Sequence, residues 1–136
     1  MPCKRLVLDS DIVFRVCHQR HWDFAQNRPD KAAFHFDPAD DAISVYLNAL
    51  IDSSQVLPLH DRPGRLASSV NGLLSLQTQK VREGGLLNVL HAPHDPGALH
   101  IAHSKIVKRS SSVHKLRAQK LLVDASLIVI PVPSRS

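Results

Sequence analysis

Short stretches of alternating hydrophobic and polar positions run through most of the chain, a pattern typical of β-strands. In DIVFRVCH, β-branched and aromatic residues predict a strand at 12–18. Strands are expected at 12–18, 31–36, 43–47, 68–81, 86–91, 98–107 and 127–133, the fourth interrupted by Asn71-Gly72. The last, LIVIPVP, is expected to be a buried strand that its prolines end.

One segment favours a helix instead. VHKLRAQKLLVDA, at 113–125, is rich in residues of high helix propensity, and Ser110–Ser112 supply candidates for its N-cap. A chain of 136 residues suits one hydrophobic core. The sequence therefore predicts a small single α+β domain over 1–136, with a mostly antiparallel sheet and a helix near the C-terminus.

The apolar runs are too short for a membrane helix, which needs roughly 20 residues. Leu127–Ile130 is one of the longest. The N-terminus lacks the hydrophobic region of a signal peptide, because Asp9 follows after three apolar residues. Cys3 and Cys17 have no spacing typical of a disulfide framework. We therefore expect a cytoplasmic protein without a membrane partner.

The net charge of +5 is unevenly distributed. Residues 1–50 carry six Lys or Arg against seven Asp or Glu, whereas 101–136 carry seven Lys or Arg against Asp124 alone. This asymmetry favours an acidic partner, nucleic acid or protein, although a solvated basic helix has the same composition. Aromatic residues are scarce, so contact with nucleic acid would be limited to its backbone. The residues expected to contact the partner are Lys105, Lys108, Arg109, Lys115, Arg117 and Lys120.

Histidine is frequent, with nine in 136 residues, six of them in His-x-x-His pairs. Imidazole is the commonest metal ligand and titrates near neutral pH. His100 and His103 fall in an expected strand, which would place them on opposite faces. We expect no metal and no cofactor. If a metal were bound, the proline-rich loop with His91, His94 and Asp95 would hold it.

Other side chains have the types needed for acid–base chemistry on an anionic substrate. Arg15 would hold the anion, and His18 or His103 would move the proton. Polar residues that could support them are Asp40, Asp41, Ser44 and Ser104. Alternatively, Arg15 pairs with a local acid such as Asp37 or Asp41. No GxSxG, P-loop, GxGxxG or HExxH motif is present.

Three short segments carry a family resemblance: FRVCH at 14–18, AFHFDPADDAISV at 33–45 and AHSKI at 102–106. They resemble landmarks of a family of small bacterial proteins. These are a Phe-Arg-x-x-His strand, an Ala-Phe segment, a Pro/Asp turn, a Ser-Val strand and a late Ala-His. That family has no assigned activity. The resemblance implies that Arg15, His18 and His103 are the positions of interest.

Together these patterns favour a small basic binding or accessory protein that contacts an acidic partner within a larger hetero-complex. The first alternative is an enzyme that acts on a phosphate- or nucleotide-like substrate through Arg15, His18 and His103. The second is a metal-dependent hydrolase built on the histidines between His91 and His103.

Overall fold

The computed structural model describes residues 4–60, 71–93 and 97–133. Within these ranges the main sheet contains β1 (Ile12–Cys17), β4 (Ala42–Leu47), β5 (Gly72–Gln77), β6 (Leu87–His91), β7 (His103–Lys108) and β8 (Leu127–Ile130). The α-helices are α1 (Ser53–His60), α2 (Thr78–Arg82), α3 (Ala98–Ala102) and α4 (Lys115–Ala125). Smaller elements are the 3-10 helices η1 (Gln19–His21), η2 (Lys31–Phe34) and η3 (Glu83–Gly85), and the paired strands β2 (Trp22–Asp23) and β3 (Arg28–Pro29).

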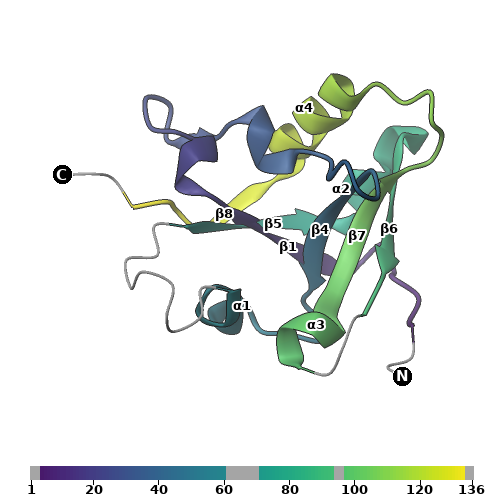
Figure 1. The fold of residues 1–136 in the computed structure, drawn as a ribbon, viewed down its shortest axis with the longest axis horizontal. Helices are drawn as coiled ribbons and strands as arrows, with labels where there is room; N and C mark the ends of the chain where they lie inside the picture. Colours follow the sequence, from purple (N-terminus) through teal and green to yellow (C-terminus); the bar gives the residue numbers. More distant parts are fainter. Residues whose placement is uncertain (1–3, 61–70, 94–96, 134–136) are drawn as a thin grey trace.

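The main sheet is antiparallel throughout, with the strand order β6-β7-β4-β1-β5-β8 (Figure 1). β1 pairs with β5 along its whole length, whereas its pairing with β4 stops at Phe14↔Tyr46. The predicted α+β class, the mostly antiparallel sheet and the helix near the C-terminus are confirmed. The strands predicted at 12–18, 43–47 and 86–91 correspond to β1, β4 and β6.

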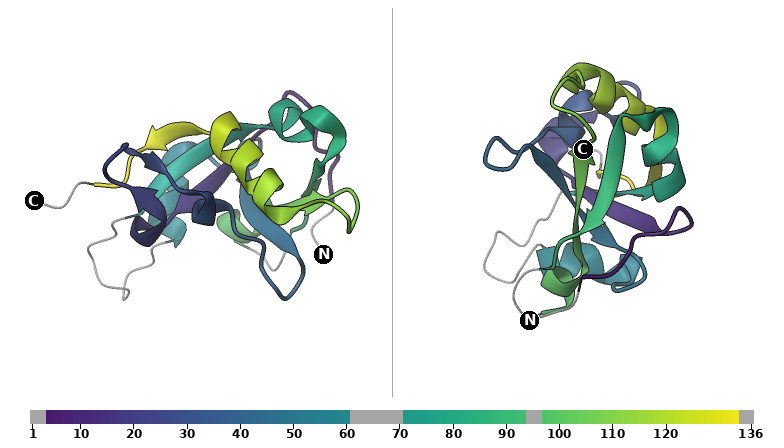
Figure 2. Two further views of the ribbon diagram at one scale, coloured as in Figure 1. Left: turned by 90° about the horizontal axis from the view of Figure 1, so that it is seen from above. Right: turned by 90° about the vertical axis from the view of Figure 1, so that its right-hand side faces the viewer.

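Both faces of the sheet carry hydrophobic cores, because successive side chains of a strand point to opposite sides. Val13 and Cys17 of β1 join the larger core, to which α2, α4 and η2 contribute. Phe14 and Val16 join the smaller core, together with side chains of α1 and α3. Figures 1 and 2 show α4 and η2 on one side of the sheet and α1 and α3 on the other.

The strand predicted at 31–36 is wrong, because residues 31–34 form η2. The side chain of Asp30 accepts a hydrogen bond from the Ala32 amide and caps this helix. The turn of helix buries Phe34 completely, and burying such a ring stabilises a fold by about 1.5–3 kcal/mol. Helix capping and aromatic burial thus outweigh the short alternating pattern.

Two other predicted strands are divided between a strand and a helix. The segment 98–107 forms α3 and then β7, so His100 lies on a helix and only His103 begins a strand. The segment predicted at 68–81 is described from Asn71 onward and forms β5 followed by α2. Asn71-Gly72 does not interrupt this strand, since Gly72 is its first residue.

The closing strand is shorter and more exposed than predicted. β8 ends at Ile130, and all four of its side chains are exposed, from 70% at Leu127 to 37% at Ile130. It forms the last strand of the described sheet, next to β5. The prediction of a buried strand is wrong, because β8 lies at the border of the described sheet and its side chains stay exposed.

The helix predicted at 113–125 is confirmed as α4, which begins at Lys115. Its N-cap is His114, so the prediction of a cap at Ser110–Ser112 is wrong. At 11 residues, α4 is far shorter than a bilayer crossing requires, and no helix in the described part of the chain meets that requirement.

Candidate functional site

The basic residues expected to contact a partner lie on two elements and the turn between them. Lys105 and Lys108 belong to β7, Arg109 follows that strand, and the other three belong to α4. They therefore do not form one continuous basic helix. Whether each charge is available to a partner depends on the groups around that residue.

Two aspartates before β4 form ion pairs with three of these lysines. Lys105 Nζ lies 2.7 Å from Asp40 Oδ2, and Lys108 Nζ lies 2.9 Å from Asp41 Oδ2. Lys115 Nζ lies 3.3 Å from the other oxygen of Asp41. Hydrogen bonds from these lysines lower the pKa of both aspartates, which stay ionised at neutral pH. Two of the three lysine charges are thus balanced within the molecule.

The remaining basic residues differ in how they are held. Arg109 Nε donates to the carbonyl oxygen of Leu87 at 2.9 Å. Arg117 and Lys120 are exposed on α4, and neither makes an ion pair with another described residue. On α4, Arg117 and Lys120 are therefore the residues whose charge remains available to a partner, whereas Arg109 keeps its charge but is tied to the backbone through one nitrogen.

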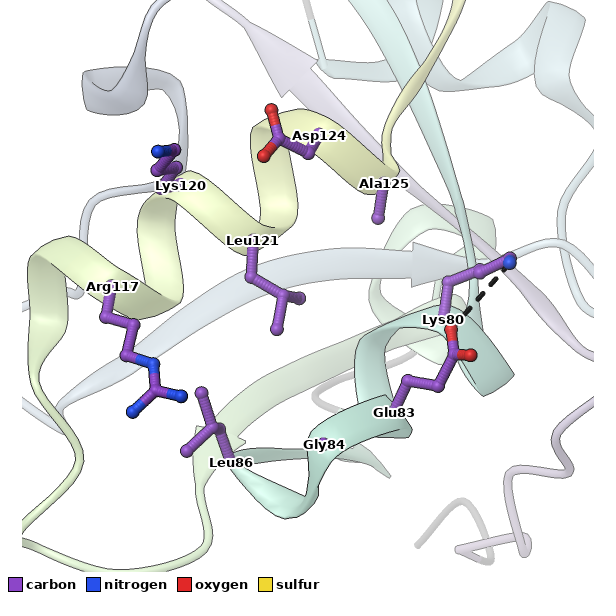
Figure 3. A pocket seen from close by; sticks show the side chains of 9 residues that line it. All are labelled: Lys80, Glu83, Gly84, Leu86, Arg117, Lys120, Leu121, Asp124 and Ala125. Atoms are coloured by element: carbon purple, nitrogen blue, oxygen red, sulfur yellow. Dashed lines mark ion pairs between the residues drawn. The ribbon is translucent and has the colours of Figure 1, made fainter.

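Arg117 and Lys120 border a groove of about 510 Å³ between α4 and the turn formed by α2 and η3 (Figure 3). Figure 3 shows Arg117 and Leu121 pointing from α4 toward Leu86, whereas Lys120 and Asp124 point away from it. The groove is lined by Lys80, Glu83, Gly84, Leu86, Arg117, Lys120, Leu121, Asp124 and Ala125. Its apolar floor is continuous with the larger core, because Leu86, Leu121 and Ala125 pack against that core.

The two acids of the groove already have partners. Glu83 lies 3.7 Å from Lys80 Nζ, and Asp124 lies 3.7 Å from Arg28 on β3. Gly84 has a φ of 84°, which favours glycine, and allows the chain to turn sharply beside the groove. The groove therefore has an apolar floor, and the charges at its border that have no ion-pair partner among the described residues belong to Arg117 and Lys120 of α4.

The guanidinium of Arg15 donates hydrogen bonds to two backbone carbonyl groups. Its Nε donates to the carbonyl oxygen of Ala33 at 2.8 Å, and its Nη1 donates to that of Ser44 at 2.9 Å. Burial lowers the pKa of the guanidinium, although the group stays charged at neutral pH. Arg15 therefore joins η2 to β4, and its described partners are carbonyl groups, not Asp37 or Asp41.

His103 reaches the same residue from β7. Its Nε2 lies 3.0 Å from Ser44 Oγ, and its Nδ1 lies 2.8 Å from the carbonyl oxygen of Ala92. The ring contacts Tyr46 edge-on, with 6.0 Å between the ring centroids. Ser44 thus receives contacts from both Arg15 and His103, through its carbonyl oxygen and its hydroxyl respectively.

His18 lies among other histidines. Its ring centroid is 6.1 Å from that of His21 and 6.0 Å from that of His60, and His21 also contacts His35 at 5.7 Å. Burial and then the charge of Arg20 lower the pKa of both His18 and His21. The imidazoles of His18 and His21 are therefore mainly neutral at pH 7.

The residues considered for a metal are held differently. His91 is 5% exposed, its Nδ1 accepts from the Arg5 amide at 3.0 Å, and its Nε2 lies 2.7 Å from the carbonyl oxygen of Ile101. Both ring nitrogens are engaged, which leaves no lone pair for a metal. His94 and Asp95 lie outside the described residues. Among the described residues, no three His, Cys, Asp or Glu side chains are grouped to hold a metal ion.

Cys17 and Ser104 point toward the interior. Burial raises the pKa of the Cys17 thiol to about 11, so the thiol is protonated at neutral pH and is a poor nucleophile. The Ser104 hydroxyl is buried and donates to the carbonyl oxygen of Ala102. Neither residue adds a reactive group to the surface around Ser44.

The half of the groove formed by α2 and η3 was not anticipated from the sequence. The strand expected at 68–81 includes residues 78–81, yet Thr78–Arg82 form a helix that ends near two glycines. Gln, Lys and Arg followed by Gly-Gly are a recognisable signal for a short helix and its end. That signal identifies the short helix but does not show that Lys80 and Glu83 lie opposite α4.

Comparison with known proteins adds no assignment. No family model, curated protein or solved structure matches this chain. The resemblance to the small bacterial family stays a prediction, and the function has to be argued from the site.

Proposed function

We propose that the protein is a binding subunit whose groove between α2 and α4 holds an acidic segment of a partner protein. The observation that carries this proposal is the pairing of an apolar floor with unpaired cations. Leu86 and Leu121 form the floor, and Arg117 and Lys120 are exposed at its border without an ion pair in the described structure. The remaining basic residues are less available, since aspartates or carbonyl groups hold them.

The groove favours a protein segment over nucleic acid. Nucleic-acid sites that bind single strands usually stack bases on aromatic rings, and none of the nine lining residues is aromatic. An apolar floor instead suits aliphatic side chains, whose burial stabilises a complex by about 25 cal/mol per Å² before the costs of association. Acidic residues beside those aliphatic side chains would meet Arg117 and Lys120.

An amphipathic helix is the occupant that this shape fits best. Arg117, Leu121 and Ala125 follow one another at intervals of four residues and so form a single stripe along α4. A partner helix with leucines along one face and glutamates beside them would present matching apolar and acidic stripes. The partner expected in the assembly is therefore an acidic amphipathic helix.

Binding of a labelled peptide tests the proposal. The probe is a helical peptide of about 15 residues built from Glu, Leu and Ala, and its fluorescence anisotropy reports binding. The double variant Arg117→Glu/Lys120→Glu should weaken binding by about tenfold or more, because it replaces attraction by repulsion. Leu121→Asp should weaken it as well, by charging the floor.

Two controls separate the groove from net charge. Lys31→Glu, compared with the single variant Arg117→Glu, makes the same change of charge at an exposed position of η2 outside the groove, and should leave peptide affinity nearly unchanged. An oligo(dT) of about 20 nucleotides provides the nucleic-acid arm. If oligo(dT) binds more tightly than the peptide and the Arg117/Lys120 variant loses it, the protein-segment proposal is wrong. If the wild-type protein binds neither probe, the groove is not an acidic docking site.

A further inference from the structure

The hydrogen bonds of His103 have a defined direction. A carbonyl oxygen can only accept, so the contact with Ala92 requires Nδ1 to carry the proton of the neutral imidazole. Nε2 then presents a lone pair, and the hydroxyl of Ser44 donates to it across 3.0 Å. In this direction the Ser44 oxygen does not use a lone pair in the hydrogen bond, and His103 Nε2 is the base that accepts the proton of the hydroxyl.

The protein holds this arrangement in place from several sides. Ala92 is joined to His103 twice, because its amide also donates to the His103 carbonyl oxygen at 3.0 Å. His103 is 6% exposed, and its ring packs against Tyr46. The Ser44 carbonyl is fixed by Arg15, whereas the Ser44 side chain is exposed. A buried base thus accepts a hydrogen bond from an exposed hydroxyl, which is the arrangement that activates a serine as a nucleophile.

The sheet register places an ion pair on the same face as Ser44. Lys105 is the cross-strand partner of Ser44, and its amino group is paired with Asp40 at 2.7 Å. Side chains of directly opposed residues in an antiparallel pair are close neighbours. Asp40 largely balances this charge, so the Lys105–Asp40 pair leaves the surface beside Ser44 polar and nearly neutral.

We propose that Ser44 is a nucleophile for acyl transfer from small carboxylic esters, and that His103 is its general base. The Ser44 oxygen forms a bond to the ester carbonyl carbon while its proton passes to His103 Nε2. The tetrahedral intermediate collapses by breaking the bond to the leaving alcohol, which takes that proton. Water then attacks the acyl-serine by the same exchange, which releases the acid and restores the hydroxyl.

This activity is independent of the groove between α2 and α4. Ser44, Tyr46 and His103 belong to the side of the sheet on which α1 and α3 lie, since Tyr46 packs against the smaller core. The groove is built on the side of the larger core. Loss of one activity by mutation therefore does not predict loss of the other.

Covalent labelling tests the proposal on the full-length protein. A fluorophosphonate probe, which reacts with activated serines, should modify wild-type protein once, and peptide mass spectrometry should place the label on Ser44. Ser44→Ala should abolish labelling. His103→Gln should slow it by about 100-fold or more, which is the usual effect of removing a general base. Ser75→Ala, on β5 of the same sheet, is the matched control and should label like wild type.

A second measurement covers the case in which His103→Gln does not fold. The hydrolysis of p-nitrophenyl acetate is compared between the wild type and Ser44→Ala. This comparison changes only Ser44, which is exposed, and leaves the buried His103 in place. The wild-type protein should release a burst of nitrophenol equal to the protein concentration, and Ser44→Ala should not. Absence of labelling in the wild type, a label on another residue, or equal rates in Ser44→Ala would each overturn the proposal. Equal labelling in a folded His103→Gln variant would remove His103 from the mechanism.

Discussion

Arg15 holds the carbonyl oxygen of Ser44 from 2.9 Å at the place where backbone pairing between β1 and β4 ends. The ladder stops at Phe14↔Tyr46, and a side chain takes over the link between the two strands. The same guanidinium holds the carbonyl oxygen of Ala33 in η2. One arginine thus ties together three elements of the fold.

Replacing Arg15 should therefore destabilise the protein. Arg15→Met keeps an unbranched apolar stem but removes both hydrogen bonds, which should lower the free energy of unfolding by about 2–4 kcal/mol. Arg15→Lys should recover only part of this loss, because an ammonium cannot reproduce the two-pronged geometry of the guanidinium. Urea denaturation measures both. Wild-type stability in Arg15→Met would show that the two links are dispensable.

Gly72 is expected to tolerate no side chain. A Cβ there would lie 2.8 Å from the carbonyl oxygen of Ile130 and 3.0 Å from the amide nitrogen of Val132. Because the clash is with backbone atoms, Gly72→Ala should push β8 away from β5 and cost about 1–3 kcal/mol. Thermal unfolding checks this, and Ser75→Ala on the same strand serves as the comparison. An unchanged melting temperature would mean that β8 is not held against β5 as described.

The histidines around His18 should make stability depend on pH. Burial lowers the pKa of His18 and His21 below 6.5, so between that folded value and 6.5 the unfolded chain binds more protons than the folded protein. Stability then rises with pH and is lost as the pH falls below about 6.5. Melting temperatures measured from about pH 7.5 to 5.5 should decline, and His21→Gln should flatten that decline. A flat wild-type profile would contradict the lowered values.

The sequence predicted the strands best where alternation and β-branched residues coincide, as in β1 and β4. The sequence pattern failed where a helix cap, or close packing between the outer strands of the sheet, determines the structure. Asp30 caps η2 in a segment whose pattern predicts a strand, and position 72 needs a glycine because Ile130 approaches it closely. Neither requirement is visible in hydrophobic periodicity.

The candidate site was only partly predictable for a related reason. Arg15 and His103 were selected as residues of interest, and the fold brings both to Ser44. The basic segment was selected by charge alone, which does not show that Asp40 and Asp41 lie beside its lysines. Those ion pairs join residues that are more than sixty positions apart, and only tertiary structure reveals them.

Releasing the paired lysines should change how the protein binds polyanions. Asp40→Asn/Asp41→Asn removes the acids that face Lys105, Lys108 and Lys115. Affinity for oligo(dT) should rise, and the dependence on salt should steepen between about 50 and 200 mM, because more phosphate contacts become available. The melting temperature should fall, since Lys108 is only 10% exposed and loses its partner. Unchanged affinity and salt dependence would mean that these aspartates do not shield the lysines.

Chemical-shift mapping of the acidic amphipathic peptide on isotope-labelled protein tests the central claim most directly, because it shows where the peptide binds. The account predicts that the largest changes fall on both walls of the groove, at Lys80, Leu86, Leu121 and Ala125. It also predicts that Lys105 and Lys108 on β7 change little, since aspartates already hold them. Changes centred on β7, or spread evenly over all basic residues, would show that the groove between α2 and α4 is not the binding site.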